Sequence, residues 1–223
     1  MKYLSWTGAA ALAMAACGGA QAQVAGTFSV RAGATQIAPQ VRSGNLSAPS
    51  FPNTKVDVES STVLTGGLTY MVTDHWALDL PVGVPFKHDF TGDGAIGGVG
   101  KLGETKVLPA TLFAQYRFYE ASAAFRPYVG LGVTYAKFFK ERTTATLNAL
   151  TGGTVANPTT ASIDSKWGIT PQVGFVWSFN ERWFVDASFY KSFLKTTTHL
   201  SSGQSIDIRL NPYVVAVGVG YRF

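Results

Sequence analysis

The last stretch of the chain, NPYVVAVGVGYRF at residues 211–223, alternates between two kinds of side chain. One parity is bulky and apolar: Tyr213, Val215, Val217, Val219, Tyr221 and Phe223. The other parity is mostly small: Val214, Ala216, Gly218, Gly220 and Arg222. Because successive side chains of a β-strand point to opposite faces, this pattern predicts a strand with one apolar face. Aromatic residues stand at both ends of that face.

The same period of two recurs in seven earlier stretches, each with one apolar parity and one small or polar parity. They cover residues 27–35, 63–72, 76–86, 108–118, 128–135, 167–179 and 183–193. Eight segments of about ten residues with this alternation are typical of a transmembrane β-barrel, whose outer face contacts lipid and whose lumen tolerates polar groups. The alternative is a soluble barrel or sandwich, in which the apolar faces point inward.

The lengths of the connections favour the membrane barrel. Long connections follow the first, third, fifth and seventh stretches, at residues 36–61, 87–106, 139–165 and 195–206. Short connections follow the second, fourth and sixth, at residues 73–75, 119–125 and 180–182. Outer-membrane barrels have this asymmetry because one end has tight periplasmic turns and the other has extracellular loops. The glycine-rich segment TGDGAIGGVGKLGE (residues 91–104) is predicted to be a mobile part of one such loop.

Aromatic residues cluster at both ends of the predicted strands. Those beside the short connections are Tyr70, Trp76, Tyr116, Phe118, Trp177, Phe179, Trp183, Tyr221 and Phe223, and those near the long connections are Phe86, Tyr135, Trp167, Phe193 and Tyr213. Trp and Tyr are favoured at membrane interfaces because their rings are amphipathic. The fold class is therefore predicted to be all-β: an eight-stranded antiparallel transmembrane β-barrel with short periplasmic turns and long extracellular loops.

Composition agrees with this fold and limits the function. Hydrophobic residues make up 46% of the chain and charged residues only 14%, against roughly 25% charge in a typical soluble protein. The Lys and Arg residues are scattered, with no basic run and no aromatic RNA-binding signature, so no nucleic-acid partner is expected.

The N-terminus predicts export. Lys2 precedes an apolar run at residues 9–16, and Ala20-Gln21-Ala22 has the small-x-small pattern of a secretory cleavage site. Residues 1–22 are thus predicted to be a signal peptide and residues 23–223 the outer-membrane β-barrel, beginning at Gln23. The alternative is lipoprotein cleavage with lipidation at Cys17, the single cysteine of the chain. The apolar run is shorter than the roughly 20 residues that a membrane-spanning helix needs.

Four stretches resemble the OmpW family of small outer-membrane proteins. They are WALDLPVGVPFKHD at residues 76–89, KVLPATLFAQYRF at 106–118, FRPYVGLGVTYAKFF at 125–139 and IRLNPYVVAVGVGYRF at 208–223. The resemblance implies an eight-stranded barrel with a narrow, largely apolar lumen that admits small hydrophobic molecules and releases them sideways into the membrane. The family usually has two prolines at the start of the fourth strand, whereas this chain has Leu108-Pro109-Ala110-Thr111. The terminal Phe223, preceded by alternating apolar residues, resembles the signal that outer-membrane assembly machinery recognises.

An eight-stranded barrel encloses room only for packed side chains or one small ligand, which excludes a broad aqueous pore. The inward candidates that would line a ligand path are Val63, Met71, Val107, Phe113, Tyr128, Val176, Phe184, Tyr190 and Leu194. These residues fit either a conduit for apolar molecules or a plugged barrel. Inward charged residues are expected to pair, since an isolated charge there would be costly; Asp186 with Arg117 is the predicted pair.

Prolines predict a weak place in the wall. Pro85 and Pro109 flank the second long connection on adjacent strands, and each removes a ladder donor. A lateral seam is therefore predicted between the third and fourth strands, near the outer surface.

The expected function is a narrow apolar conduit for passage of small hydrophobic molecules into or across the outer membrane of a Gram-negative cell. The alternative is a structural or surface-interaction barrel with a plugged lumen that displays extracellular loops. His75, His88 and His199 have neither a local nucleophile arrangement nor metal-ligand spacing, so no enzyme activity, cofactor or metal is expected. The expected partners are outer-membrane lipid, small hydrophobic molecules and, through the C-terminal strand, the assembly machinery.

Overall fold

The computed structural model describes residues 23–223, so the predicted signal peptide and Cys17 lie outside the described residues. The long strands are β1 (Phe28–Ala38), β4 (Ser61–Met71), β5 (Trp76–Gly83), β6 (Phe86–Gly94), β7 (Lys101–Arg117), β8 (Phe125–Thr143), β10 (Lys166–Ser178), β11 (Trp183–Lys191) and β14 (Tyr213–Arg222). The shorter elements are β2 (Arg42–Ser43), β3 (Thr54–Val58), α1 (Ala145–Thr151), β9 (Ala161–Ile163), β12 (Lys195–Leu200) and β13 (Ser205–Arg209). Within residues 23–223 no helix is both long and apolar enough to cross a membrane.

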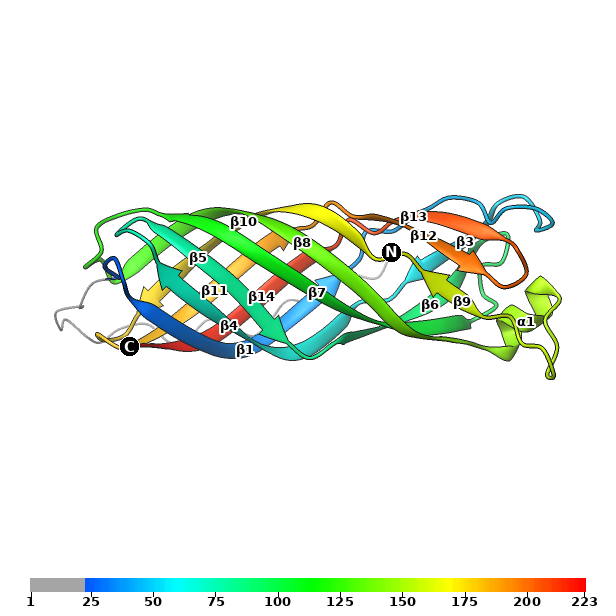
Figure 1. The fold of residues 1–223 in the computed structure, drawn as a ribbon, viewed down its shortest axis with the longest axis horizontal. Helices are drawn as coiled ribbons and strands as arrows, with labels where there is room; N and C mark the ends of the chain where they lie inside the picture. Colours follow the sequence, from blue (N-terminus) through cyan, green and yellow to red (C-terminus); the bar gives the residue numbers. More distant parts are fainter. Residues whose placement is uncertain (1–22) are drawn as a thin grey trace.

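Eight antiparallel strands form a closed barrel (Figure 1). The order around the barrel is β1, β4, β5, β7, β8, β10, β11 and β14, and β14 pairs with β1 to close the ring. In that closing pair Gly33 lies opposite Gly218. Closure pairs neighbouring strands around most of the ring, which matters in the hydrocarbon because every unpaired backbone group is costly there. The predicted eight-stranded barrel is confirmed.

The two ends of the barrel differ as the connection lengths predicted (Figure 1). Short turns join β4 to β5, β7 to β8 and β10 to β11 at the end where the chain terminates. At the other end β7 and β8 continue well past the barrel, and β3 pairs with β6 beside them. A four-stranded sheet of β2, β13, β12 and β9 completes this extracellular extension.

Much of the long extracellular connections forms regular strands. The segment at residues 91–104 is largely a hairpin, because β6 continues to Gly94 and β7 begins at Lys101. Alternating apolar residues are the physical reason: Leu102, Ile206 and Ile208 are each 5% exposed or less in the interior of the extension. Burial of these side chains stabilises the strands. In the sequence, the many glycine, serine and threonine residues around them are typical of loops.

The outward parity is exposed along the barrel, as expected of a lipid-facing surface. Exposed residues on separate strands include Leu64 on β4 (79%), Leu131 on β8 (59%) and Val217 on β14 (52%). Aromatic residues group at both rims: Trp76 packs edge-on against Tyr116 with ring centres 5.3 Å apart, and the rings of Tyr135 and Trp167 lie 4.8 Å apart at the opposite end. These two girdles bound the membrane-spanning part of the barrel.

Phe86 departs from the predicted outward parity. It points inward, is 4% exposed, and packs in a cluster with Ile37, Val107 and Val214. The reason is the pairing around it. Asp79 lies opposite Phe113, and Phe86 lies opposite Val107. The two pairs are seven positions apart from β5 to β6 but six positions apart on β7, so one side has an extra residue. One extra residue reverses the parity of everything that follows it.

Candidate functional site

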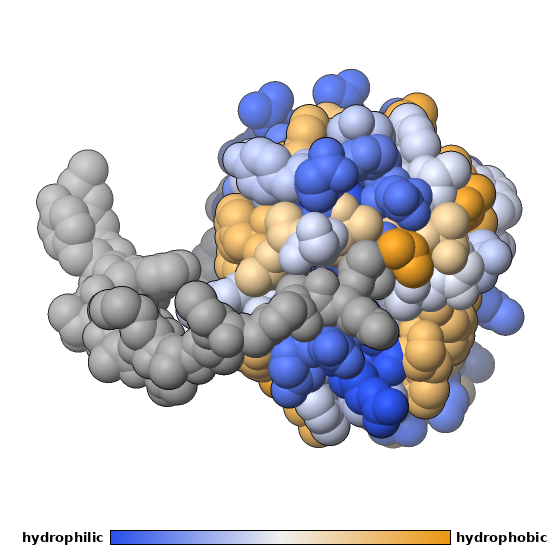
Figure 2. All heavy atoms as spheres, turned by 90° about the vertical axis from the view of Figure 1, so that its left-hand side faces the viewer, coloured by the Kyte–Doolittle hydropathy of each residue, from blue (hydrophilic) through white to orange (hydrophobic). Residues whose placement is uncertain are grey.

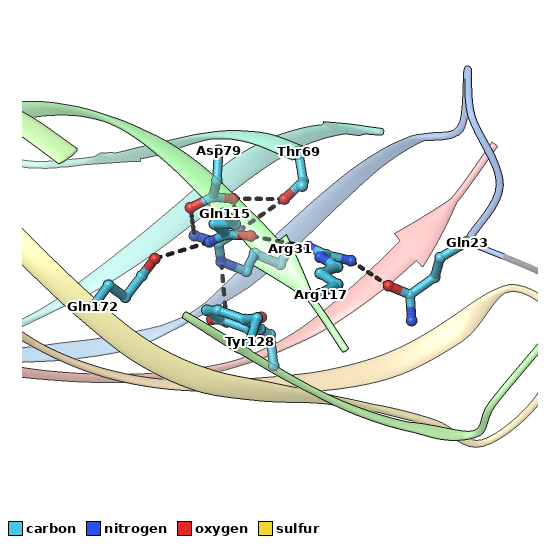
Figure 3. A network of polar contacts seen from close by, with 9 residues as sticks. Gln23, Arg31, Thr69, Asp79, Gln115, Arg117, Tyr128 and Gln172 are labelled. Carbon is cyan, nitrogen blue, oxygen red and sulfur yellow. Dashed lines mark hydrogen bonds and ion pairs between the residues drawn. The ribbon is translucent and has the colours of Figure 1, made fainter. Parts of the chain in front are cut away.

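An ion-pair network crosses the barrel interior in its periplasmic half (Figure 3). Arg31 of β1 donates to both carboxylate oxygens of Asp79 of β5, at 2.5 and 2.9 Å. Thr69 of β4 donates to the same carboxylate at 2.6 Å, and Asp186 of β11 lies 3.7 Å from Nε of Arg31. Asp79 is completely buried. Inward polar residues of three other strands thus converge on the Arg31 guanidinium.

A second layer lies beside the first, toward the short-turn end. Arg117 donates to the side-chain oxygens of Gln23 and, at 3.2 Å, of Gln115. Gln115 donates to Gln172 at 2.9 Å, and Arg117 lies over the ring of Tyr128. The predicted Arg117–Asp186 pair is wrong: Asp186 lies nearest to Arg31 and accepts from the Tyr128 hydroxyl at 3.1 Å.

Packed apolar side chains fill the remaining space at this level. Tyr128, Val176 and Phe184 form a buried cluster, and Phe113 is completely buried. Gly220 leaves room for Phe184, because a Cβ at that glycine would lie 2.1 Å from the ring. The short-turn end face carries patches of hydrophilic residues with hydrophobic ones between them (Figure 2). We call the polar network and this packed cluster together the floor.

An apolar cavity of about 90 Å³ lies above the floor; we call it the upper cavity. Its wall includes the buried cluster of Ile37, Phe86, Val107, Ala136, Leu194 and Val214. Tyr190 separates the upper cavity from the polar pocket around Arg31 and Asp186, since it lines both. The lumen is therefore packed in one half and hollow in the other.

A second cavity of about 130 Å³ lies in the extracellular extension; we call it the vestibule. Its apolar lining includes Leu46, Phe51, Ile96, Leu102, Leu147 and Leu200. Phe90, Ile163, Thr198 and Ile208 line both the vestibule and the upper cavity. The two cavities are thus neighbours with a shared wall.

The barrel wall beside the upper cavity is incompletely paired. Pairing of β5 with β7 ends at Asp79 and Phe113, and pairing of β6 with β7 begins at Phe86 and Val107. Between these points residues 80–85 and 108–112 of the described chain form no cross-strand pair with each other. We call this gap the seam. Val82, Val84 and Leu108 line the upper cavity from the seam, although they are 38–57% exposed on the outside.

We expect amide hydrogen exchange to reveal the seam in detergent-solubilised protein. Amides at residues 80–85 and 108–112 that face the gap have no ladder acceptor, so they should exchange roughly a hundredfold faster than those facing β4 or β8. Protection should therefore alternate along each stretch, because successive residues of an antiparallel strand bond to opposite neighbours. Uniformly slow exchange through both stretches would contradict an open seam.

A charged cluster lies at the extracellular rim, above the upper girdle. Glu104 accepts hydrogen bonds from Lys101 at 2.6 Å and lies 2.8 Å from Lys87, and these lysines lower its pKa to about 2. Lys101 also lies 2.9 Å from Asp89. The rim therefore keeps fixed, mutually compensated charges at neutral pH, while the walls of both cavities below it are mostly apolar.

The predicted lumen residues divide between the two halves. Val107, Tyr190 and Leu194 line the upper cavity, and Val63 packs against its apolar cluster. The other five predicted residues lie in the packed lower part: Met71, Phe113, Tyr128, Val176 and Phe184. Pro109 lines the upper cavity at the seam, and Pro85 directly precedes β6.

Sequence reasoning missed several cavity residues. Phe86 and His88 belong to a strand whose parity reverses at the seam. Ile163 lies in the long connection predicted at residues 139–165, and Ile208 lies between the predicted connection at 195–206 and the last predicted strand. His75 stacks on Tyr116 at the short-turn end, and His199 lies on β12 with Asp164 3.8 Å away. The only available signal was the short alternation in IDIRL (residues 206–210) and FKHDF (residues 86–90).

An antiparallel sheet closed on itself, apolar outside and bounded by two aromatic girdles, defines an integral β-barrel protein of the outer membrane. The chain belongs to the OmpW family, whose model matches residues 24–223. It is 37% identical to outer membrane protein W of Vibrio cholerae serotype O1 over 89% of each chain. It is 26% identical to the dibenzothiophene metabolism operon protein PahQ of Pseudomonas aeruginosa, covering 80% of this chain and 79% of PahQ.

A solved structure agrees with the fold. The crystal structure of the outer membrane protein OprG from Pseudomonas aeruginosa matches with a TM-score of 0.81 and 29% identity, covering 92% of this chain and 99% of OprG. The family and its structural relatives are outer-membrane barrel proteins rather than enzymes.

Proposed function

We propose that the protein conducts small hydrophobic molecules from the cell exterior into the outer membrane. A molecule enters the vestibule, passes the shared wall at Phe90 and Ile208, occupies the upper cavity, and leaves sideways through the seam. One observation carries this proposal: Val82, Val84 and Leu108 line the upper cavity and are also exposed on the outer, lipid-facing side of the barrel. Val63, Val107, Tyr190 and Leu194 would contact the passing molecule, and Pro85 and Pro109 would keep the seam open.

The floor supports a sideways exit over passage straight into the periplasm. Asp79, Phe113 and Val176 are each completely buried, so the lower lumen has little room for a solute. Crossing it would also require separating Arg31 from Asp79, and breaking a buried ion pair is strongly unfavourable. The five predicted path residues that lie in the floor would therefore serve closure rather than passage.

The apolar lining supports hydrophobic cargo. Transfer from water to an apolar wall is favourable in proportion to the apolar area buried, about 25 cal/mol per Å². Movement through the seam into acyl chains keeps the molecule in an apolar environment, so passive diffusion suffices. The name of the relative PahQ, which refers to the metabolism of the apolar aromatic molecule dibenzothiophene, is compatible with such cargo.

Membrane insertion needs a partner of its own. We propose that the outer-membrane assembly machinery recognises the C-terminal strand. Phe223 is 74% exposed at its end, and the alternating apolar residues of β14 face outward.

The function is tested by the initial rate at which an apolar fluorescent probe, N-phenyl-1-naphthylamine, enters Gram-negative cells that express the protein. We expect faster entry than in cells with an empty vector, and no faster entry of a hydrophilic sugar in a liposome-swelling assay. Equal entry of the apolar probe with and without the protein would favour the alternative, a plugged barrel that displays its extracellular extension.

A further inference from the structure

His88 is the one histidine in the wall of the upper cavity. It belongs to the inward parity of β6 together with Phe86 and Phe90, which also line the cavity. The imidazole is 4% exposed and stacks on Phe86 at an interplanar angle of 20°. The imidazole is therefore a polar group in a cavity wall that is mostly aliphatic and aromatic.

Hydrogen bonding fixes the tautomer of this ring. Nδ1 of His88 lies 2.7 Å from the backbone carbonyl oxygen of Glu59. A carbonyl oxygen can only accept, so Nδ1 carries the proton and donates. The distal nitrogen, Nε2, then has a free lone pair and acts as an acceptor only.

Most hydroxyl groups of the cavity wall are already bonded to one another. Thr111, Thr134, Thr170 and Ser192 form a chain with oxygen separations of 2.8, 2.6 and 3.0 Å. Thr35 and Thr65 form a further pair at 2.6 Å. Nε2 of His88 and the hydroxyls of Thr198 and Tyr190 have no hydrogen-bond partner within residues 23–223. A hydroxyl can donate or accept, whereas Nε2 of the neutral ring requires a donor.

We propose that His88 selects small apolar molecules that carry one hydrogen-bond donor, such as medium-chain alcohols or phenols, over equally large molecules without one. The donor of the ligand bonds to Nε2 while its apolar part packs on Phe86, Val107 and Leu194. The inference rests on the proposed function, since it names the class of molecule that the upper cavity takes.

Burial supports a neutral ring at physiological pH. It lowers the pKa of His88 below 6.5, although the Glu59 carbonyl and the Asp89 carboxylate act in the opposite direction. The ionisable groups around it are Lys87 and Asp89 on its own strand, Lys106 and Glu104 opposite them on β7, and Glu59 directly after β3. As the pH falls through the lowered pKa, Nε2 takes up a proton and can no longer accept, so the selectivity for donors should disappear.

The test compares 1-octanol with octyl methyl ether, which has the same chain but no donor, by their binding to the protein in lipid nanodiscs. One hydrogen bond contributes about 0.5–1.5 kcal/mol, so the alcohol should bind roughly twofold to tenfold more tightly. In His88→Phe, which keeps the aromatic contact with Phe86, the two affinities should become equal. Tyr190→Phe and Thr198→Val, which remove the other free hydroxyls, should keep the preference.

Each outcome is informative. Binding of neither molecule would contradict the proposed function, whereas equal binding of both to the unmodified protein would overturn the role of His88 alone. Loss of the preference in Tyr190→Phe or Thr198→Val, with retention in His88→Phe, would overturn it as well. Should His88→Phe not fold, the ¹⁵N shift of Nε2 in the unmodified protein decides: it should move with 1-octanol and not with the ether.

Discussion

Asp79→Ala is expected to lower the free energy of unfolding by about 3 kcal/mol or more, the usual effect of removing one partner of a buried ion pair. Asp79 is completely buried and accepts from both Arg31 and Thr69. Without it the Arg31 guanidinium keeps only the neutral Thr69 hydroxyl, at 3.1 Å, and the Asp186 carboxylate, 3.7 Å away. Urea unfolding in lipid vesicles, followed by tryptophan fluorescence and by electrophoretic mobility, measures the change.

Asp207→Ala is the matched control. Asp207 also pairs with a single cation, with Lys195 2.8 Å away, but both side chains are more than half exposed. Water replaces such a partner at little cost, so the control should stay close to the unmodified protein. An Asp79→Ala protein as stable as the control would mean that the floor does not depend on this pair.

A double-mutant cycle separates the pair from its surroundings. Arg31→Met should also be strongly destabilising, because it leaves Asp79 and Asp186 buried without their cation. Arg31→Met combined with Asp79→Ala removes both charges of the pair, and it should cost clearly less than the sum of the two single changes. Coupling energies of about 0.5–3 kcal/mol are typical of residues in contact.

Period two was enough to predict the barrel. Alternation places residues such as Val217 and Leu131 on the lipid face and glycines such as Gly220 beneath large side chains, and this holds for any closed sheet of this kind. The nine predicted lumen residues all lie on the inward face, because parity is a local property of each strand. Pro85 and Pro109 lie in the two stretches that form no cross-strand pair with each other, and a lateral exit there stays a proposal.

Partners across the lumen could not be predicted in the same way. Parity predicts which charged residues point inward: Arg31, Asp79, Arg117 and Asp186. The tilt of the strands decides how far along the barrel axis each of them lies. That position, which parity does not give, brings Asp186 to Arg31. A closed sheet also hides a change of parity. The extra residue between Asp79 and Phe86 turns His88 into the cavity. The alternation in FKHDF groups Phe86, His88 and Phe90 on one face but does not say that this face points inward.

The extracellular extension was missed for a related reason. Its strands are short and rich in threonine and glycine, and they pair across long separations, such as Arg42 with Arg209. Local composition indicates a loop there, whereas burial of Leu102 and Ile208 between distant segments makes strands. The vestibule could therefore not be predicted, since most of its wall comes from these segments.

Ala136→Phe is expected to slow the entry of the apolar probe by roughly tenfold, the equivalent of about 1.4 kcal/mol in the barrier. Ala136 is 2% exposed and lies in the wall of the upper cavity, among Phe86, Val107 and Leu194. A phenyl ring at this position would occupy most of a 90 Å³ space. The rate of N-phenyl-1-naphthylamine entry into expressing cells measures the effect.

Ala114→Phe is the matched control. Ala114 lies opposite Leu131 on the lipid face, so this variant makes the same chemical change outside the lumen. It should leave the entry rate unchanged. Overpacking costs about 1–3 kcal/mol, so the urea midpoint of Ala136→Phe must first show that the barrel is folded. A folded Ala136→Phe protein with normal entry would mean that apolar molecules bypass the upper cavity, and the route from vestibule to seam would then be wrong even if the protein still speeds uptake.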